Sequence, residues 1–577
     1  MNFIHRGRFR PAWPVILLAC LLVPACAVLP AGGPWQEAGY DVIIEGGRVV
    51  DGTGAAWFYG DVAMRGDRIV RVAPPGALRN AAASERVDAR GMVVAPGFID
   101  IQSHSRGAFL SGDGRVVSKV TQGITTEIMG EGTTNAPVNR RTLGASADAP
   151  EGRQLLERYG GAGGFDRWLR DMEENGVSPN VGSFVGGSTL RTYGMGTTEG
   201  AAPPAALDSM RQALAWAMED GAFGMATALI YPPAAFAGTD ELAAVAEAMA
   251  PYGGIYITHL RSEADRLLDA IDEAVEIGRR ANVPVEIYHL KAAGTRNYPT
   301  AAAAVERIDD ARAAGLDVQA NMYPYTAGST GLTSCFPPWA SADDALFDNL
   351  ADPATRARIR AEIERPTAEW ENLCELSGPE NVLILGLRNA ELRSYEGKRL
   401  DEIARMRGVD WIEAALELVL EERSRVNTIY FMMAEENVRM QLRQPWMKFG
   451  TDAGGQDPRT ARDLTHPRAY GTFPRILGLY VRQEGVLELE DAVRKMSSAV
   501  ATRLGLQDRG VLREGMYADV VVFDPETVID RATYEEPHLL AVGVPHVFVN
   551  GVAVVRNGAH TGATPGRVVR GPGWTGR

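Results

Sequence analysis

The chain has 577 residues and a formal net charge of −14 at pH 7. Its length suggests more than one domain, and its contents of hydrophobic residues (45%) and charged residues (23%) are ordinary for a globular enzyme. An acidic surface repels nucleic acid and offers no electrostatic reason to bind anionic lipid, so we exclude nucleic acid as a partner.

The first 27 residues, 1–27, are predicted to be a secretory signal segment. Arginines at positions 6, 8 and 10 precede an apolar run at 15–23 that is too short to span a bilayer as a helix. Val23-Pro24-Ala25-Cys26 resembles a bacterial lipobox, which would make Cys26 the first residue of a membrane-anchored lipoprotein. Ordinary cleavage after Ala27 is the alternative, because small residues flank that site. In both cases we expect an exported, periplasmic protein of a bacterium.

Short strands are predicted at both ends of the remaining chain. Residues 41–50 have the pattern of a β-hairpin, and further strand patterns follow to about residue 94. Near the other end, Asn550-Gly551 is a type I′ turn signal between two strand patterns. Neither end has enough strand to bury a core alone. We therefore predict one small β-domain, a sandwich or barrel, built from residues 40–95 together with residues 505–570.

Strand and helix patterns alternate between these ends. A helix pattern covers 263–281, with Ser262 as its candidate N-cap. Eight strands alternating with helices predict an α/β fold in which residues 96–504 form a (β/α)8 TIM barrel. The candidate strands are 92–100, 124–130, 180–185, 223–230, 255–259, 283–290, 317–323 and 447–452.

The gap of about 120 residues before the last strand is too long for a plain loop. It contains helix patterns near 353–365 and 401–422, so we predict an inserted subdomain over residues 333–445. Cys335 and Cys374 lie in this segment. An oxidising compartment permits a disulfide between them, and two free buried thiols agree with the sequence equally well.

Polar residues follow several of the predicted strands. His104 and Glu131 follow the first two, and His259, His289 and Asp452 follow the fifth, sixth and eighth. The carboxyl ends of barrel strands meet at one rim, where such enzymes build their active sites. Imidazole and carboxylate suit a catalytic zinc, which acidifies its water and polarises a carbonyl, and a nearby carboxylate can pass a proton to a leaving amine. Each residue alone also has an ordinary structural interpretation, such as a hydrogen-bonding histidine or a solvated loop acid.

Several motifs together resemble the amidohydrolase superfamily and, within it, the N-acyl-D-amino-acid deacylases. The resemblance covers about residues 40–570 and implies a zinc-dependent (β/α)8 barrel beside a small β-domain. The most specific motifs are Pro-Gly-Phe-Ile-Asp at 96–100 and the segments 258–263, 289–291, 323–330, 466–475 and 510–519.

The resemblance also implies roles for individual residues. His259 and His289 would hold the tightly bound zinc, and Asp452 would be the catalytic acid and base. A guanidinium fork matches a carboxylate bidentately, so a small-molecule substrate with a free carboxylate is expected. The residues implied to bind that substrate are Lys291, Tyr323, Ser329 and, on its α-carboxylate, Arg468.

The chain departs from the family pattern at two positions. The family has His-x-His on the first strand, where this chain has Gln102-Ser103-His104. The family has a bridging cysteine after the second strand, where this chain has Glu131 between two glycines. We interpret Glu131 as the anionic substitute. His104 is a further candidate ligand, but a second metal position loses a strong donor at Gln102, so we predict a single zinc.

The predicted function is zinc-dependent cleavage of the amide bond of N-acyl-D-amino acids, giving a carboxylate and a free amino acid. The preference for the D configuration comes from the resemblance alone. A dipeptidase or a cyclic-amide hydrolase of the same superfamily is the enzymatic alternative, and Arg468 favours substrates with a free carboxylate over cyclic amides. A non-catalytic binding protein on the same fold is the other alternative. The sequence does not determine the oligomeric state.

Overall fold

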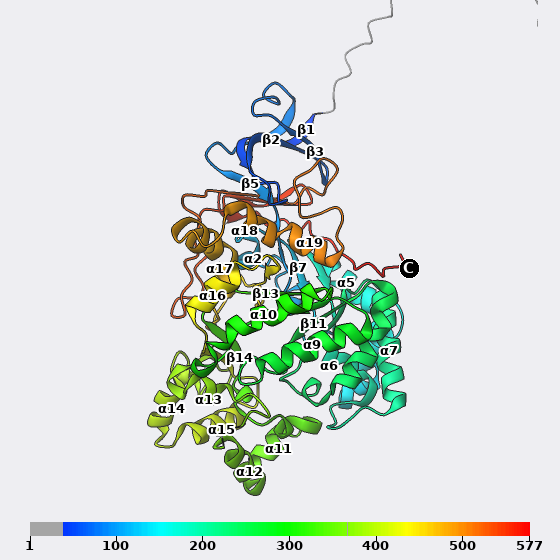
Figure 1. The fold of residues 1–577 in the computed structure, drawn as a ribbon, viewed down its shortest axis with the longest axis vertical. Helices are drawn as coiled ribbons and strands as arrows, with labels where there is room; N and C mark the ends of the chain where they lie inside the picture. Colours follow the sequence, from blue (N-terminus) through cyan, green and yellow to red (C-terminus); the bar gives the residue numbers. More distant parts are fainter. Residues whose placement is uncertain (1–38, 366, 577) are drawn as a thin grey trace, which may run out of the picture. The chain divides into compact units, whose positions relative to one another are not determined.

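The computed structural model describes residues 39–365 and 367–576. The predicted signal segment 1–27, with Cys26, lies outside the described residues. Within the described part of the chain, no helix combines the length and the apolar character needed to cross a membrane. Strands and helices alternate along the chain (Figure 1), and the α/β class predicted from the sequence is confirmed.

One sheet combines strands from both ends of the chain (Figure 1). Its strand order is β21-β20-β19-β18-β5-β1-β2-β3, with β4 also paired to β1. The two halves join where Ala95 pairs with Val521 in antiparallel β5 and β18. These strands are apolar on their inner face, so pairing them buries a core that neither half could enclose alone. The strands are β1 (Tyr40–Val49), β2 (Phe58–Arg65), β3 (Arg68–Ala73), β4 (Ala83–Asp88), β5 (Val93–Pro96), β18 (Val520–Phe523), β19 (His546–Val549), β20 (Val552–Arg556) and β21 (Ala559–His560).

The central strands form two parallel sheets, ordered β6-β7-β8 and β9-β10-β11-β12-β13-β17. The sheets meet at two places. Only Phe184 separates β8 from β9, and its N–H donates to Met129 O. At the other edges, Ser103 and Ala453 form a parallel bridge after β6 and β17. The strands are β6 (Phe98–Asp100), β7 (Ile124–Met129), β8 (Asn180–Ser183), β9 (Val185–Gly186), β10 (Gly224–Ala228), β11 (Ile255–His259), β12 (Val285–Ile287), β13 (Val318–Met322) and β17 (Met447–Phe449).

The predicted first barrel strand, 92–100, is wrong as a single strand. It divides into β5, which joins the nine-stranded sheet built from both ends of the chain, and β6, which joins β7. Pro96 ends β5 because proline has no N–H to donate. A Cβ at Gly97 would lie 2.2 Å from Thr125 Oγ1, so only glycine allows the two segments to approach so closely at the division.

Helices flank the parallel strands (Figure 1). Among them, α7 contacts β10, α9 contacts β12 and α10 contacts β13. The predicted N-cap of α9 is wrong, because the helix begins at Leu267 with Arg266 as its N-cap. The helices outside the insertion are α1 (Arg106–Ser111), α2 (Val117–Val120), α3 (Arg140–Leu143), α4 (Pro150–Tyr159), α5 (Gly164–Asn175), α6 (Gly187–Met195), α7 (Pro204–Glu219), α8 (Thr239–Ala246), α9 (Leu267–Ala281), α10 (Thr300–Ala313), α16 (Glu435–Leu442), α17 (Arg468–Arg475), α18 (Leu489–Met496) and α19 (Ser498–Leu504).

Between β13 and β17 lies an insertion, defined here as residues 327–431, with its own hydrophobic core. It opens with β14 (Ala327–Gly331), which pairs antiparallel with β16 (Asn427–Phe431), and β16 also pairs with β15 (Val382–Gly386). The inserted subdomain predicted over residues 333–445 overlaps this segment. Its helices, which gather together in Figure 1, are α11 (Leu346–Ala351), α12 (Pro353–Ile363), α13 (Leu373–Ser377), α14 (Leu400–Arg407) and α15 (Trp411–Glu422).

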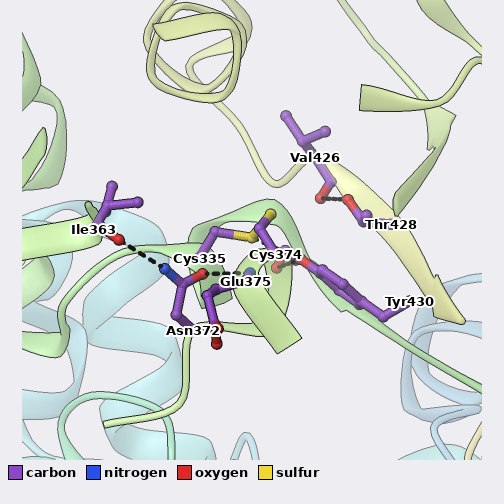
Figure 2. Close-up of a disulfide and its surroundings, with 9 residues drawn as sticks. Cys335, Ile363, Asn372, Cys374, Glu375, Val426, Thr428 and Tyr430 are labelled. Atoms are coloured by element: carbon purple, nitrogen blue, oxygen red, sulfur yellow. Dashed lines mark hydrogen bonds between the residues drawn. A yellow bond between two sulfur atoms is a disulfide. The ribbon is translucent and has the colours of Figure 1, made fainter. Parts of the chain in front are cut away.

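A disulfide joins Cys335 to Cys374 inside the insertion (Figure 2). It connects the segment that follows β14 to α13, across 39 positions of sequence, with the two Cα atoms 5.2 Å apart. Asn372 caps α13 by accepting a hydrogen bond from the Glu375 N–H at 3.1 Å (Figure 2). A cross-link of this span stabilises a fold by restricting the unfolded chain. Of the two alternatives that the sequence left open for these cysteines, the structure has the disulfide.

Candidate metal centre

Side chains at the carboxyl ends of β7, β11 and β12 converge on one point. Glu131 lies two residues past β7, His259 is the last residue of β11, and His289 lies two residues past β12. The nitrogens His259 Nδ1 and His289 Nε2 are 3.0 Å apart. Glu131 Oε1 lies 3.5 Å from the first nitrogen and 3.4 Å from the second. The three predicted ligands therefore form one compact donor cluster.

The other nitrogen of each ring faces Glu263. Glu263 Oε1 lies 2.9 Å from His289 Nδ1, and Glu263 Oε2 lies 3.6 Å from His259 Nε2. A carboxylate can only accept hydrogen bonds, so Glu263 favours protons on these outer nitrogens and lone pairs on the inner ones. Lys291 Nζ, 2.9 Å from His289 Nδ1, competes for that outer nitrogen because an ammonium can only donate. Burial by itself raises the pKa of Glu263, but His259, Lys291 and His289 hold that pKa well below its ordinary value. Glu263 is the last residue of the 258–263 motif, but its orienting role was not predicted from the sequence.

The donor cluster fits a tetrahedral zinc ion. Imidazole and carboxylate bind zinc at about 2.0–2.2 Å, so donors at tetrahedral corners lie about 3.3–3.6 Å apart. Both distances from Glu131 fall in this range, and the distance between the two histidine nitrogens is slightly shorter. Two lone pairs and a carboxylate oxygen that point at one another repel unless a cation lies between them. The chemistry and the spacing of the cluster therefore both suit a metal ion.

Two residues of the site have a left-handed backbone. The φ angles are 32° at His289 and 49° at Asp452, values that cost a non-glycine residue about 1–3 kcal/mol. Each conformation is fixed by a neighbouring side chain. Asn321 Oδ1 accepts from the His289 N–H at 3.0 Å, and Asp100 Oδ1 accepts from the Thr451 N–H at 2.9 Å, one residue before Asp452. The left-handed backbone at these two positions thus directs both side chains into the cavity.

The second oxygen of Glu131 is occupied by a neighbouring amide. Gln102 Nε2 donates to Glu131 Oε2 at 2.6 Å. His104 Nε2 lies 3.4 Å from the same oxygen and 2.8 Å from Asp452 Oδ1. His104, Glu131 and Asp452 could together hold a further cation by distance alone. However, Gln102 takes one lone pair of the oxygen through which Glu131 would reach that cation, so the cation would have to share this oxygen with the amide.

Asp452 lies between two cationic or hydrogen-bonding neighbours. Its Oδ2 lies 2.7 Å from Arg468 Nη1, and its Oδ1 lies 2.8 Å from His104 Nε2. Burial by itself raises the pKa of Asp452, but Arg468 and then His104 outweigh burial and hold the pKa below its ordinary value. Asp452 is therefore an ionised carboxylate at neutral pH, which is the form that can accept a proton.

The residues expected to bind substrate line the same cavity as the donor cluster, a cavity of about 810 Å³. The Arg468 guanidinium lies over the Tyr323 ring, 4.5 Å from its centroid, and donates to Ser329 O at 3.2 Å. Its Nε atom is buried and has no hydrogen-bond partner among the described residues. Lys291 points instead at Glu263, with its Nζ 2.6 Å from the carboxylate. Arg468 thus has donor capacity left for a ligand.

Two contributions to this cavity were not assigned from the sequence. His466 Nδ1 accepts from the Arg468 N–H at 3.0 Å, and His466 Nε2 donates to Ala327 O at 2.9 Å. Burial, then Arg468, holds the pKa of His466 well below its usual range, so this histidine stays neutral and can accept. The insertion also supplies part of the cavity wall, through Thr333, Ser341, Asp344, Leu373, Leu385, Arg425, Asn427 and Tyr430.

Comparison with known proteins relates this arrangement to a family. A profile of the amidohydrolase family matches residues 397–555. The chain is 36% identical to the D-aminoacylase of Alcaligenes xylosoxydans xylosoxydans, over 92% of this chain and 97% of that protein. It is 34% identical to the N-acyl-D-glutamate deacylase of the same organism, over 92% and 96%. The chain belongs to the N-acyl-D-amino-acid deacylase family of amidohydrolases.

Solved structures of this deacylase family share the fold. The N-acyl-D-glutamate deacylase of Bordetella bronchiseptica, in complex with zinc and a phosphonate inhibitor that mimics the tetrahedral intermediate, has a TM-score of 0.75 and 32% identity. A D-aminoacylase structure that addresses one-metal activation and second-metal attenuation at a binuclear centre has a TM-score of 0.75 and 34% identity. Each alignment covers 92% of this chain and 100% of the other.

Replacing Glu263 with glutamine should weaken zinc binding by about 10- to 100-fold, the usual effect of losing a carboxylate that orients metal-binding histidines. Competition with a zinc chelator measures the dissociation constant. Glu273→Gln is the matched control, because Glu273 pairs with Arg261 at 2.8 Å and contacts neither histidine. Equal zinc affinities for the two variants and the wild type would contradict the orienting role of Glu263.

The wild-type protein should retain one zinc per chain after exhaustive dialysis, because Gln102 occupies the second oxygen of Glu131. Gln102→His replaces that amide with a metal ligand and should raise the content toward two. Gln102→Ala removes the amide without adding a ligand and serves as the control. Elemental analysis of each protein gives the ratio, and two tightly held ions in the wild type would overturn the single-zinc interpretation.

Proposed function

We propose that this protein is a zinc-dependent hydrolase that cleaves the amide bond of N-acyl-D-amino acids and releases a carboxylate and a free D-amino acid. The observation that carries the proposal is that one cavity holds the Glu131, His259 and His289 donor cluster together with Asp452 and Arg468. A protein that only bound carboxylates would not need the donor cluster, and a site that only bound a metal ion would not need Arg468. The family relationship adds the substrate class.

Glu131, His259 and His289 would hold the zinc. When bound there, zinc polarises a carbonyl group and increases the acidity of water. Gln102 and Glu263 keep the donors of this chain in place, the first by donating to Glu131 and the second by orienting both imidazoles. We propose that one ion is sufficient, since this chain fills the position of a second ion with its own hydrogen bonds.

Arg468 would bind the α-carboxylate of the substrate. Its guanidinium is buried, stacks on Tyr323 and has a free Nε donor, so an incoming carboxylate would gain charge-assisted hydrogen bonds in a site shielded from water. His466 and Ser329 fix the backbone and the head of this arginine and so limit the orientations that a bound carboxylate can take. Because the scissile amide of the substrate is attached to the same carbon as the α-carboxylate, holding the carboxylate in one orientation also positions the amide.

Asp452 would be the general acid and base of the reaction. It is an ionised carboxylate in the cavity of the donor cluster, linked to Glu131 through His104, and it pairs with Arg468 of the substrate-binding wall. From that position it can take a proton from the attacking water and deliver it to the departing amine. The left-handed backbone at Asp452 supports a functional role, because a residue without one would relax to a less costly conformation.

We also propose that the two parallel sheets act together as a (β/α)8 barrel. The hydrogen bonds at Phe184 and the bridge between Ser103 and Ala453 support this interpretation. So does the site itself, because its residues follow the carboxyl ends of strands from both sheets, as in barrel enzymes. The small sheet of residues 40–96 and 520–560 would pack beside this barrel as a separate unit.

We propose export for the whole protein. The pattern of residues 1–27 supports a signal segment, and the Cys335–Cys374 disulfide suits the oxidising periplasm. Lipid attachment at Cys26 would tether the enzyme to a membrane surface, where it would act on small acylated amino acids.

The central prediction is that zinc-supplemented residues 28–577 release amine from N-acyl-D-amino acids and leave the L enantiomers untouched. Asp452→Asn should lower kcat by about 10²- to 10⁴-fold, as expected for loss of a general acid and base, while keeping its zinc. Asp463→Asn, at an exposed aspartate that lines the same cavity, is the control. Turnover of cyclic amides or dipeptides in place of acyl-amino acids would replace this proposal, and turnover of no amide would favour a binding protein.

Arg468→Ala should raise KM by about 30-fold or more, because truncating one partner of a buried charge pair costs about 2–5 kcal/mol. The sharper test compares an N-acetyl-D-amino acid with the N-acetylated amine that lacks its carboxylate. The wild type should discriminate strongly between the two compounds, and the variant should lose that discrimination. Arg468→Lys, which keeps the charge but loses the fork, should fall between them. Unchanged discrimination in Arg468→Ala would exclude the carboxylate role.

A further inference from the structure

A carboxylate of the insertion binds the loop that follows the metal-site strand β11. Glu371 Oε1 accepts from Ser262 Oγ at 2.8 Å and from the Ala264 N–H at 2.8 Å, and it also accepts from the Glu263 N–H. Three donors thus meet on a single oxygen atom. Ser262 Oγ also accepts from the Arg266 N–H at 3.2 Å, so this serine binds the residue before α9 while its hydroxyl donates to Glu371.

The loop bound in this way carries the carboxylate that orients both histidines. The N–H of Glu263 is held by Glu371, its C=O accepts from the Ala293 N–H at 2.7 Å, and its side chain faces His259 and His289. Glu263 is therefore held at its backbone on both sides and at its side chain. Of these attachments, the one to Glu371 comes from outside the barrel segment.

Glu371 itself is fixed by the disulfide region. It precedes Asn372, the N-cap of α13, and Cys374 in the first turn of that helix is bonded to Cys335 (Figure 2). A second contact runs parallel to it, since the Gly294 N–H donates to Met432 O, just past β16, at 2.8 Å. The insertion and the residue directly after it thus contact both loops that follow the histidine-bearing strands.

The surroundings of Glu371 fit a group placed for its hydrogen-bond geometry. Its Oε2 atom is buried and has no partner in the described chain, so this side chain forms no ion pair there. Burial, then the nearby Glu263, raises the pKa of Glu371 to about 7. A buried carboxylate with a purely structural role normally has a lysine or arginine partner that offsets its desolvation cost. Glu371 acts instead as the hydrogen-bond acceptor for the 262–264 loop.

We propose that Glu371 is a positioning residue of the metal centre: it holds the 262–264 loop so that Glu263 can orient His259 and His289, and the Cys335–Cys374 disulfide holds Glu371. The insertion would thereby set the metal affinity and the turnover rate as well as forming a cavity wall. The predicted effect on turnover rests on the proposed function, whereas the predicted effect on zinc affinity does not.

The test compares Glu371→Ala and Glu371→Gln with the control Glu375→Ala. Glu375 is an exposed residue of the same helix that pairs with Arg296. Glu371→Ala should weaken zinc binding and lower kcat by about 10- to 100-fold, with KM little changed. Glu371→Gln keeps an acceptor oxygen for the three donors and should restore most of both quantities. Wild-type zinc affinity in Glu371→Ala, or an equal loss in Glu375→Ala, would overturn the proposal.

A double-mutant cycle tests the link to the disulfide. The Cys335→Ala/Cys374→Ala protein should lose zinc affinity in the same direction as Glu371→Ala, and adding Glu371→Ala to it should cause little further loss. Fully additive losses would show that the disulfide does not act through Glu371. A wild-type protein that binds zinc but has no deacylase activity would refute the proposed function, while the zinc affinities of the variants would still decide the role of Glu371.

Discussion

Two imidazole nitrogens, His259 Nδ1 and His289 Nε2, approach each other to 3.0 Å, with an oxygen of Glu131 within 3.5 Å of both. Atoms that each present a lone pair do not gather in this way unless the protein forces them to, because their mutual repulsion grows as water is excluded. Glu263 opposes that repulsion from the far side of the rings, with its carboxylate 2.9 Å from His289 Nδ1 and 3.6 Å from His259 Nε2. The strands bring these three side chains together, and contacts from the insertion help to hold them there.

The parallel strands supply the coarse placement. His259 ends one strand and His289 lies two residues past the adjacent strand, while Glu131 reaches the same point from the other sheet, so no loop has to carry a ligand far. Fine placement then comes from side chains that neither bind metal nor touch substrate. Glu263 sets the tautomers, Asn321 holds the backbone at His289, and His466 holds the backbone of the carboxylate-binding arginine.

The two departures from the family pattern compensate for each other. A carboxylate at Glu131 offers two oxygens where a thiolate offers one sulfur, and the additional oxygen needs a partner when it is buried. Gln102 supplies that partner, in a position where a histidine would have been a metal ligand. His104 is retained, and it contacts Asp452 more closely than it contacts Glu131. Reading the substitutions separately suggests a damaged site, whereas together they form a hydrogen-bonded one.

Much of the molecule could be predicted from sequence because its signals are local. Apolar runs ending in His259 and His289 predict buried strands with ligands at their ends, and the Asn550-Gly551 turn predicts a hairpin. The spacing of the same residues suffices to predict which side chains share a rim, since parallel strands bring their carboxyl ends together. The motifs around Asp452 and Arg468 then link that rim to a family.

Other features depend on contacts between distant segments, which no local pattern records. The run at 92–100 has one continuous strand pattern, yet close packing against Thr125 divides it between two sheets. Ser262 has the character of a helix cap, but α9 begins only at Leu267, and the Ser262 hydroxyl donates to a carboxylate more than 100 positions away. The pairing of Cys335 with Cys374, and the use of Glu263 and Glu371 as supports, were likewise decided by the tertiary structure. A side chain's hydrogen-bond partner depends on which segments fold against it, and the sequence alone determined only which residues were able to take part.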